Sequence, residues 1–302
     1  MKKLIAISII VLALALGTAI WLNARNTAPK SNSASSPPKP GLTTVTPDES
    51  FVLTPGPMIG TTTANPSIIA VNTPTAVTVT SVITDPSVIP TGVNLLRLNA
   101  NGTSTVLGQL KDDGTNGDVV AGDKTFTIVK TFNEPATGEI KLQGSAAFRG
   151  LLKRLVSGLV MIQLWHLVDN SNAGYSILFP PGFELSHTTS ISHGTPIDEM
   201  VLSSPTASGE TSVRILSVEL PTPINSAADL DINNGSIKII SQSLSFIAGR
   251  ESLISEILSP GGAFIQYDIL KDSTHLIEII VGSDIDATKK AIIGNIVASI
   301  KF

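Results

Sequence analysis

The chain has 302 residues, a formal net charge of −4 and no cysteine, which excludes a disulfide framework, a thiol nucleophile and a zinc–thiolate site. Acidic residues are concentrated in residues 169–302, where fifteen Asp and Glu face seven Lys and Arg. Such an excess repels phosphate backbones and anionic lipid headgroups, so the composition argues against nucleic acid as a partner.

Residues 4–22 contain no charged side chain and follow Lys2 and Lys3. This stretch is long enough to cross a bilayer as a helix, and the flanking lysines place everything after residue 25 outside the cytoplasm. Residues 1–25 have two interpretations. They are either an uncleaved anchor, which makes the chain a single-pass protein of the cell membrane, or a signal peptide cleaved after small residues, which makes it secreted. The length of the apolar run favours the anchor.

Residues 26–66 are rich in proline, serine, threonine and alanine, and carry few charges. A segment of this composition cannot bury enough apolar surface to fold, and proline keeps it extended. The sequence therefore predicts a disordered linker that holds the following domains away from the membrane.

From residue 67 the pattern changes to short apolar runs separated by turn residues. These predicted strands are residues 75–83, 93–99, 105–110, 125–132, 139–143 and 159–167. The first of them alternates, with Val77 and Val79 on one face, and Asn101 and Gly102 between two later runs are typical of a two-residue hairpin. Strands at this spacing predict an all-β immunoglobulin-like sandwich over residues 67–168.

A polar, turn-rich stretch at residues 169–174 predicts a domain boundary. Beyond it, predicted strands cover residues 175–179, 200–203, 213–220, 244–247, 253–258, 264–270 and 275–281. Residues 226–234 predict a short helix, and Asp286 is placed to cap a final one. The final helix has one apolar face, made of Ile292, Ile293, Ile296, Val297 and Ile300. The pattern predicts an α+β domain, residues 169–302, with an antiparallel sheet and a C-terminal helix.

Two segments resemble known families. Residues 107–128, LGQLKDDGTNGDVVAGDKTFTI, resemble a segment of bacterial extracellular immunoglobulin-like domains of the choice-of-anchor type, except at Lys124, where that segment usually has glycine. Residues 169–302 resemble a PsbP-like α/β domain in three short stretches. These are YSILFPPGF at 175–183, FIAGRESLIS at 246–255 and SIKF at 299–302. The resemblances imply folds and export, and they carry no catalytic residues.

The first of these segments contains a cluster of candidate calcium ligands. They are Asp112, Asp113, Asn116, Asp118 and Asp123, interleaved with glycines. Acids at the first and twelfth positions and glycine at the sixth match a calcium loop, but the third position is glycine and the flanks predict strands instead of helices. The alternative is a glycine-rich connection in which the Asp side chains accept backbone N–H bonds in tight turns.

A second candidate set follows the strand at 175–179. It consists of His187, His193, Asp198 and Glu199, a transition-metal or acid–base combination whose spacing matches no established motif. The alternative is a polar surface loop. The other two histidines, His166 and His275, lie in apolar runs, which indicates packed side chains.

No established nucleophile, metalloprotease or phosphate-binding motif is present in the sequence. We therefore expect an exported, membrane-tethered, non-enzymatic protein that binds or scaffolds in the bacterial cell envelope, with an envelope protein or a polysaccharide as partner and no cofactor except calcium at the acidic loop. Two alternatives stay open. One is an extracytoplasmic hydrolase or its accessory subunit, with a site in the C-terminal domain near residues 187–199, and the other is a purely structural envelope component.

Overall fold

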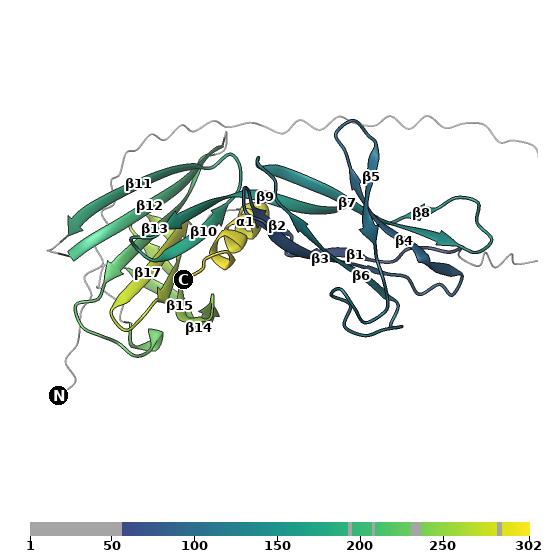
Figure 1. The fold of residues 1–302 in the computed structure, drawn as a ribbon. Helices are drawn as coiled ribbons and strands as arrows, with labels where there is room; N and C mark the ends of the chain where they lie inside the picture. Colours follow the sequence, from purple (N-terminus) through teal and green to yellow (C-terminus); the bar gives the residue numbers. More distant parts are fainter. Residues whose placement is uncertain (1–55, 193–194, 207–208, 231–236, 283–285) are drawn as a thin grey trace, which may run out of the picture. The chain divides into compact units, whose positions relative to one another are not determined.

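The computed structural model describes residues 56–192, 195–206, 209–230, 237–282 and 286–302 (Figure 1). The predicted membrane helix and residues 26–55 of the predicted linker lie outside these residues. The prediction of a disordered linker up to residue 66 was wrong at its end, because Thr62–Asn65 form a paired strand, β1. Within the described part of the chain, no helix is both long and apolar enough to cross a membrane. The described chain is mostly β-structure, mainly antiparallel, and ends in one α-helix, as the strand-like composition predicted.

Two sheets form the first part of the described chain. The smaller has the order β1-β3-β6, with β1 at Thr62–Asn65, β3 at Thr75–Val82 and β6 at Thr125–Phe132. The larger has the order β10-β9-β7-β4-β5, with β4 at Val88–Leu98, β5 at Ser104–Gln109, β7 at Gly138–Phe148, β9 at Val160–Asn170 and β10 at Tyr175–Phe179. Two short strands add to it: β2 (Ile68–Ala70) pairs parallel with β9, and β8 (Leu155–Val156) pairs with β7.

The two sheets face each other across one hydrophobic core. Side chains from β3 and β6, such as Val79 and Phe126, pack with side chains from β4, β7 and β9, such as Leu95, Leu142 and Ile162. The alternation predicted for residues 75–83 is confirmed, because Val77, Val79, Ser81 and Ile83 are all fully buried. A strand whose odd residues are apolar has only one face to bury, so the sequence pattern selects the sandwich packing.

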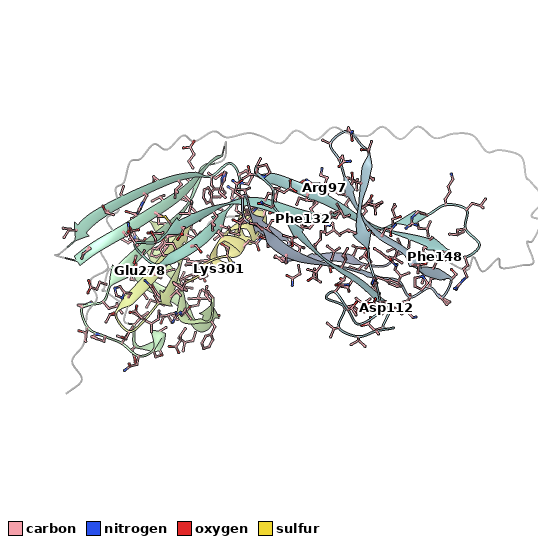
Figure 2. The ribbon with its side chains drawn as sticks, in the orientation of Figure 1. Arg97, Asp112, Phe132, Phe148, Glu278 and Lys301 are labelled. Atoms are coloured by element: carbon pink, nitrogen blue, oxygen red, sulfur yellow. The ribbon has the colours of Figure 1, made fainter. Side chains whose placement is uncertain are left out.

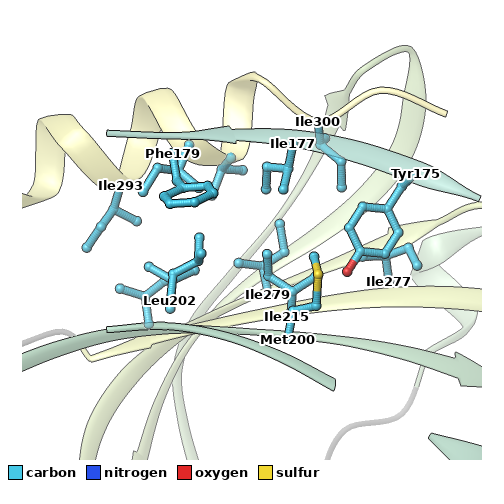
Figure 3. Packing of buried hydrophobic residues seen from close by; sticks show 14 of the residues in the cluster. Tyr175, Ile177, Phe179, Met200, Leu202, Ile215, Ile277, Ile279, Ile293 and Ile300 are labelled. Atoms are coloured by element: carbon cyan, nitrogen blue, oxygen red, sulfur yellow. The ribbon is translucent and has the colours of Figure 1, made fainter. Parts of the chain in front are cut away.

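A third sheet contains seven antiparallel strands in the order β11-β12-β13-β17-β16-β15-β14. The strands are β11 (Glu184–Ser192), β12 (Thr195–Thr206), β13 (Gly209–Glu219), β14 (Lys238–Ile247), β15 (Arg250–Ser259), β16 (Gly262–Leu270) and β17 (His275–Gly282). Strand β10 and helix α1 (Ala287–Ala298) pack on one face of this sheet. Figure 3 shows Phe179 and Ile293 lying above Leu202 in that core.

Helix α1 is as predicted. The Asp286 side chain accepts a hydrogen bond from the backbone N–H of Lys289 at 2.9 Å, which makes it the N-cap. Ile293, Ile296 and Val297 are buried against the sheet. Beyond the helix, Ser176 on β10 exchanges two backbone hydrogen bonds with Lys301, which holds the end of the chain to β10.

Other predictions of local structure were wrong. The helix predicted at 226–234 is a single 3₁₀ turn, η1 (Ala227–Asp229), and residues 231–234 lie outside the described residues. The loop suggested as the alternative for residues 187–199 is largely the hairpin of β11 and β12. This segment is polar on both faces and so lacks the apolar alternation that marks a half-buried strand, but β11 pairs with β12 along its whole length and β12 pairs with β13.

The predicted domain boundary at 169–174 lies where β9 ends and turns into β10. Strand β9 pairs with β7 through residues 160–164 and with β10 through residues 166–170. Its side chains divide accordingly, since Ile162 belongs to the sandwich core and Trp165 to the core beneath α1. One strand therefore contributes to both hydrophobic cores.

The burial of Ile279 on β17 can be tested by truncation. We expect Ile279→Ala to lower the free energy of unfolding by about 2–5 kcal/mol, because the side chain is fully buried and its removal leaves a cavity. The matched control is Leu258→Ala on β15, whose side chain is largely exposed and whose cost should be below about 1 kcal/mol. Denaturant titration of both variants measures the difference. Equal losses would contradict the packing described.

Candidate functional site

The acidic loop connects β5 to β6 and brings three carboxylates together. Oxygens of Asp112, Asp118 and Asp123 all lie within 4.8 Å of one another. Asp118 is only 7% exposed, whereas Asp123 is exposed. Three carboxylates from one loop, one of them buried, are a donor set that a hard cation such as calcium accepts.

Backbone hydrogen bonds explain why these side chains converge. Asp112 accepts from the N–H groups of Gly122 (2.6 Å) and Lys124 (3.1 Å), and Asp118 accepts from Gly114 N–H at 2.6 Å. The backbone of Lys124 has a φ of +74°, in the region that favours glycine. This conformation gives a physical reason for the glycine that the resembling segment usually has at this position.

The other two predicted ligands lie outside the cluster. Asp113 accepts from the N–H and hydroxyl of Thr115 at 3.0 and 2.6 Å, and it pairs with Lys111 at 3.4 Å. The hydrogen bond from Thr115 lowers the pKa of Asp113. Asn116 donates to Thr115 Oγ1 at 3.4 Å and has a positive φ of 53°. The carboxylates that the loop brings together are therefore those of Asp112, Asp118 and Asp123.

The second predicted set, the histidines and acids of residues 187–199, does not come together at one site, because Asp198 and Glu199 lie on opposite faces of β12. Nε2 of His187 on β11 lies 2.9 Å from Asp198 Oδ2 on β12, and Asn170 Nδ2 donates to the other oxygen of Asp198 at 2.7 Å. Glu199 is the next residue along β12, so its side chain points to the opposite face, where it accepts from Arg214 Nε at 2.7 Å. His193 lies outside the described residues.

The His187 pair adjoins a buried phenol. Tyr175 on β10 is buried, its hydroxyl has no hydrogen-bond partner among the described residues, and burial raises its pKa. The His187 ring itself is 41% exposed. A carboxylate oriented by an amide and bonded to imidazole can position a proton, but no hydroxyl nucleophile among the described residues bonds to this ring.

The two remaining histidines differ from the prediction of packed side chains. His166 is exposed, although its ring stacks on Phe179 with 5.0 Å between centroids. His275 is half-buried at the turn between β16 and β17, and its Nδ1 lies 2.9 Å from Asp272 Oδ1. Each ring lies on the same strand face as core side chains but at the margin of the core, since His166 pairs with Phe179 near the end of β10 and His275 is the first residue of β17.

Two buried acids on the third sheet were missed in the sequence. Asp268 on β16 and Glu278 on β17 are cross-strand neighbours, 0% and 3% exposed. Gln266 Nε2 donates to Asp268 Oδ1 at 2.8 Å, while Asp268 Oδ2 has no hydrogen-bond partner among the described residues. Each acid interrupts an apolar run at a position that alternation assigns to the face opposite α1. The acid within each apolar run was the signal in the sequence that could have identified these residues. The sequence did not show that the two strands pair so as to place the acids side by side.

Burial raises the pKa of both acids, and the nearby Asp268 raises that of Glu278 further. Two carboxylates that share a buried site cannot both ionise at low cost, so the pair retains a proton near neutral pH. The same face carries the segment around η1, whose Leu220, Ile224 and Leu230 form a small apolar cluster with Leu253 and Leu276.

An open pocket of about 260 Å³ lies beside α1. It is lined by Ile247, Ile254 and Tyr267 from the sheet and by Val297 from the helix, among other apolar groups. None of the sequence-predicted site residues lines it, so the predicted acids and histidines do not converge in this hollow.

The buried acid pair predicts a pH dependence of stability. Its folded pKa values, about 7 for Asp268 and about 8 for Glu278, exceed the unfolded value of about 4. The folded state therefore binds more protons, and the contribution of the pair is complete below about pH 4 and is lost as pH rises through 7 and 8.

We accordingly expect the melting temperature to fall between about pH 5 and pH 8, and Glu278→Gln to remove roughly half of that fall, because burial still raises the pKa of the remaining Asp268. Glu219→Gln, which removes an exposed carboxylate from β13, serves as the control. Thermal unfolding followed by circular dichroism measures all three proteins. A wild-type melting temperature that is flat over this range would contradict the buried pair.

The chain was also compared with known proteins. No protein-family model matches it, and a search of curated proteins finds no significantly similar sequence. The functional argument therefore rests on the residues and geometry described above.

Proposed function

We propose that this chain is an exported, membrane-tethered, non-enzymatic binding or scaffolding protein of the bacterial cell envelope. In this proposal residues 1–25 are the anchor, and the stalk runs from residue 26 to the start of β1 at Thr62. Residues 67–168 form an immunoglobulin-like sandwich of the choice-of-anchor type, and residues 169–302 form a PsbP-like α+β domain. The two facing sheets and the helix-covered antiparallel sheet support these assignments at the level of architecture.

Exposed aliphatic side chains on loops of the sandwich carry the proposal. Val119 in the acidic loop is 90% exposed, and Leu152, after β7, is fully exposed. Aliphatic side chains also fill both hydrophobic cores. Val119 and Leu152 have the same chemical character but lie on loops, in contact with solvent. Aliphatic groups on loops held by a rigid scaffold are typical of binding surfaces.

Calcium at the acidic loop is part of the proposal. The cluster of Asp112, Asp118 and Asp123 supports it, although the backbone hydrogen bonds of the same side chains also suit a loop without a metal. Extracellular modules of this kind bind calcium at about 10⁻⁴–10⁻³ M, so the ion would stabilise the loop only where calcium is abundant.

A thermal-shift measurement tests the calcium site. We expect millimolar calcium to raise the melting temperature relative to chelator, because an ion that binds only the folded state stabilises it by mass action. Asp118→Asn should abolish the shift. Asp113→Asn is the control, since that carboxylate faces Lys111 and should leave the shift intact. Identical melting curves of the wild-type chain in calcium and in chelator would leave only the turn interpretation.

The binding role is tested by affinity capture with the full chain as bait in detergent extracts of envelopes. We expect a specific envelope protein or polysaccharide to be retained, and Val119→Asp to reduce its recovery at least about tenfold, since a charge in a desolvated contact costs over 1.4 kcal/mol. Met58→Asp is the control, because this exposed side chain lies outside the acidic loop. Undiminished recovery with the loop variant would contradict binding through the acidic loop.

The hydrolase alternative has one observation in its favour. His187, Asp198 and Asn170 form a hydrogen-bonded series that orients an imidazole, as acid–base catalysis requires. Under this alternative His187→Gln would abolish turnover of an envelope ester or glycoside, whereas our proposal expects no turnover to lose. Assays of the purified chain against a panel of such substrates distinguish the two functions.

A further inference from the structure

The chain between β7 and β8 is a tight hairpin with the sequence RGLLKR, residues 149–154, which we call the 149–154 loop. Leu151 is 42% exposed and Leu152 is fully exposed, with Arg149, Lys153 and Arg154 on either side. In Figure 1 the loop extends beyond the label of β8, at the end of the sandwich. The loop therefore carries two solvent-exposed leucines between three cationic side chains.

The loop is held in this shape by its own hydrogen bonds. Arg154 donates to Ser145 Oγ (2.9 Å), to the carbonyl of Ser145 (2.8 Å) and to the carbonyl of Gly92 (2.6 Å). Leu151 N–H donates to the Phe148 carbonyl, and Gly150 has a φ of +85°. Because its base is fixed on both sides, the loop presents its leucines in a defined geometry, with little ordering entropy left to lose on contact.

The sequence around the loop is cationic. No Asp or Glu occurs between Glu139 and Asp169. The nearest connection, residues 83–87, accepts the Arg149 N–H at Ser87, and its one acid, Asp85, is bonded to the N–H and hydroxyl of Ser87. The acidic loop, in which Figure 2 labels Asp112, contacts the other end of this connection, where the N–H of Ile83 donates to the Lys124 carbonyl, and its four aspartates accept N–H groups of their own loop and of the first residue of β6.

We infer that the 149–154 loop docks on the surface of an anionic phospholipid bilayer, with Leu151 and Leu152 among the acyl chains and Arg149 and Lys153 on the headgroup phosphates. This inference rests on the proposed function, because it makes the tethering membrane the partner of the sandwich. Aliphatic side chains flanked by cations and without acids are the composition of interfacial membrane contacts.

The tether favours a lipid partner over a soluble one. If residues 1–25 span the bilayer, the linker confines the sandwich to a layer on the order of 100 Å deep, at about 3 Å per extended residue. Within that layer the effective concentration of lipid surface is high, so two leucines and two cations suffice for a contact that would be weak in free solution.

The absence of cysteine makes the loop directly testable, because a single introduced thiol can be labelled in the full chain. Leu152→Cys carries an environment-sensitive nitrobenzoxadiazole label, and the chain is reconstituted through its N-terminal helix into vesicles. The vesicles contain phosphatidylcholine alone or mixed with phosphatidylglycerol, with and without nitroxide-bearing lipid. Val119→Cys is the matched control, an exposed aliphatic position on the same sandwich without flanking cations.

We expect the label at position 152 to shift to shorter emission wavelength and to be quenched by nitroxide lipid in the anionic vesicles, while the label at 119 stays aqueous. Adding Arg149→Gln and Lys153→Gln should reduce the lipid-contacting fraction relative to the free fraction about tenfold or more. Thermal unfolding of each variant verifies that the sandwich is intact.

Aqueous emission at position 152 in both kinds of vesicle would overturn the inference. Equal lipid contact with and without phosphatidylglycerol would overturn recognition of anionic headgroups. Flotation of the same samples reports the tether separately. A chain that does not float with vesicles contradicts the proposed anchor, whereas a chain that floats with an aqueous label at 152 contradicts only the loop inference.

Discussion

Burial of aliphatic side chains on one face of each strand is the interaction on which this structure depends. Without cysteine, no covalent bond between side chains constrains the folded state, so packing must hold both cores. Val77 and Val79 on β3 and Ile277 and Ile279 on β17 show the result, since all four are fully buried. This burial fixes the register of each strand, because a slip of one residue would expose the whole apolar face.

The same alternation decides which polar side chains can meet. Neighbouring Asp198 and Glu199 point to opposite faces of β12, and each finds its own partner, His187 or Arg214. Residues on neighbouring strands are brought together instead, as when β16 and β17 pair Asp268 with Glu278. Polar chemistry in this fold is therefore organised in cross-strand pairs.

These pairs explain how much could be predicted from the sequence. Local features were readable: the alternation of β3, the cap at Asp286 and the convergence of acids in the glycine-rich loop all depend on residues near one another. The register between paired strands cannot be read from the alternation within one strand. The β11–β12 hairpin was therefore partly mistaken for a loop, and the buried acid pair was missed although its residues interrupt apolar runs.

In the proposed function the two cores provide stability, and loops of the sandwich bind a partner outside the cytoplasm. Delivery there is the central claim of this proposal, and protease accessibility tests it most directly. Protease added to intact spheroplasts should digest the chain to a short membrane-bound N-terminal fragment. The cleavage sites should all lie after residue 25, in the linker or beyond it. Recovery of the undigested, full-length chain from the soluble cytosolic fraction would contradict the account.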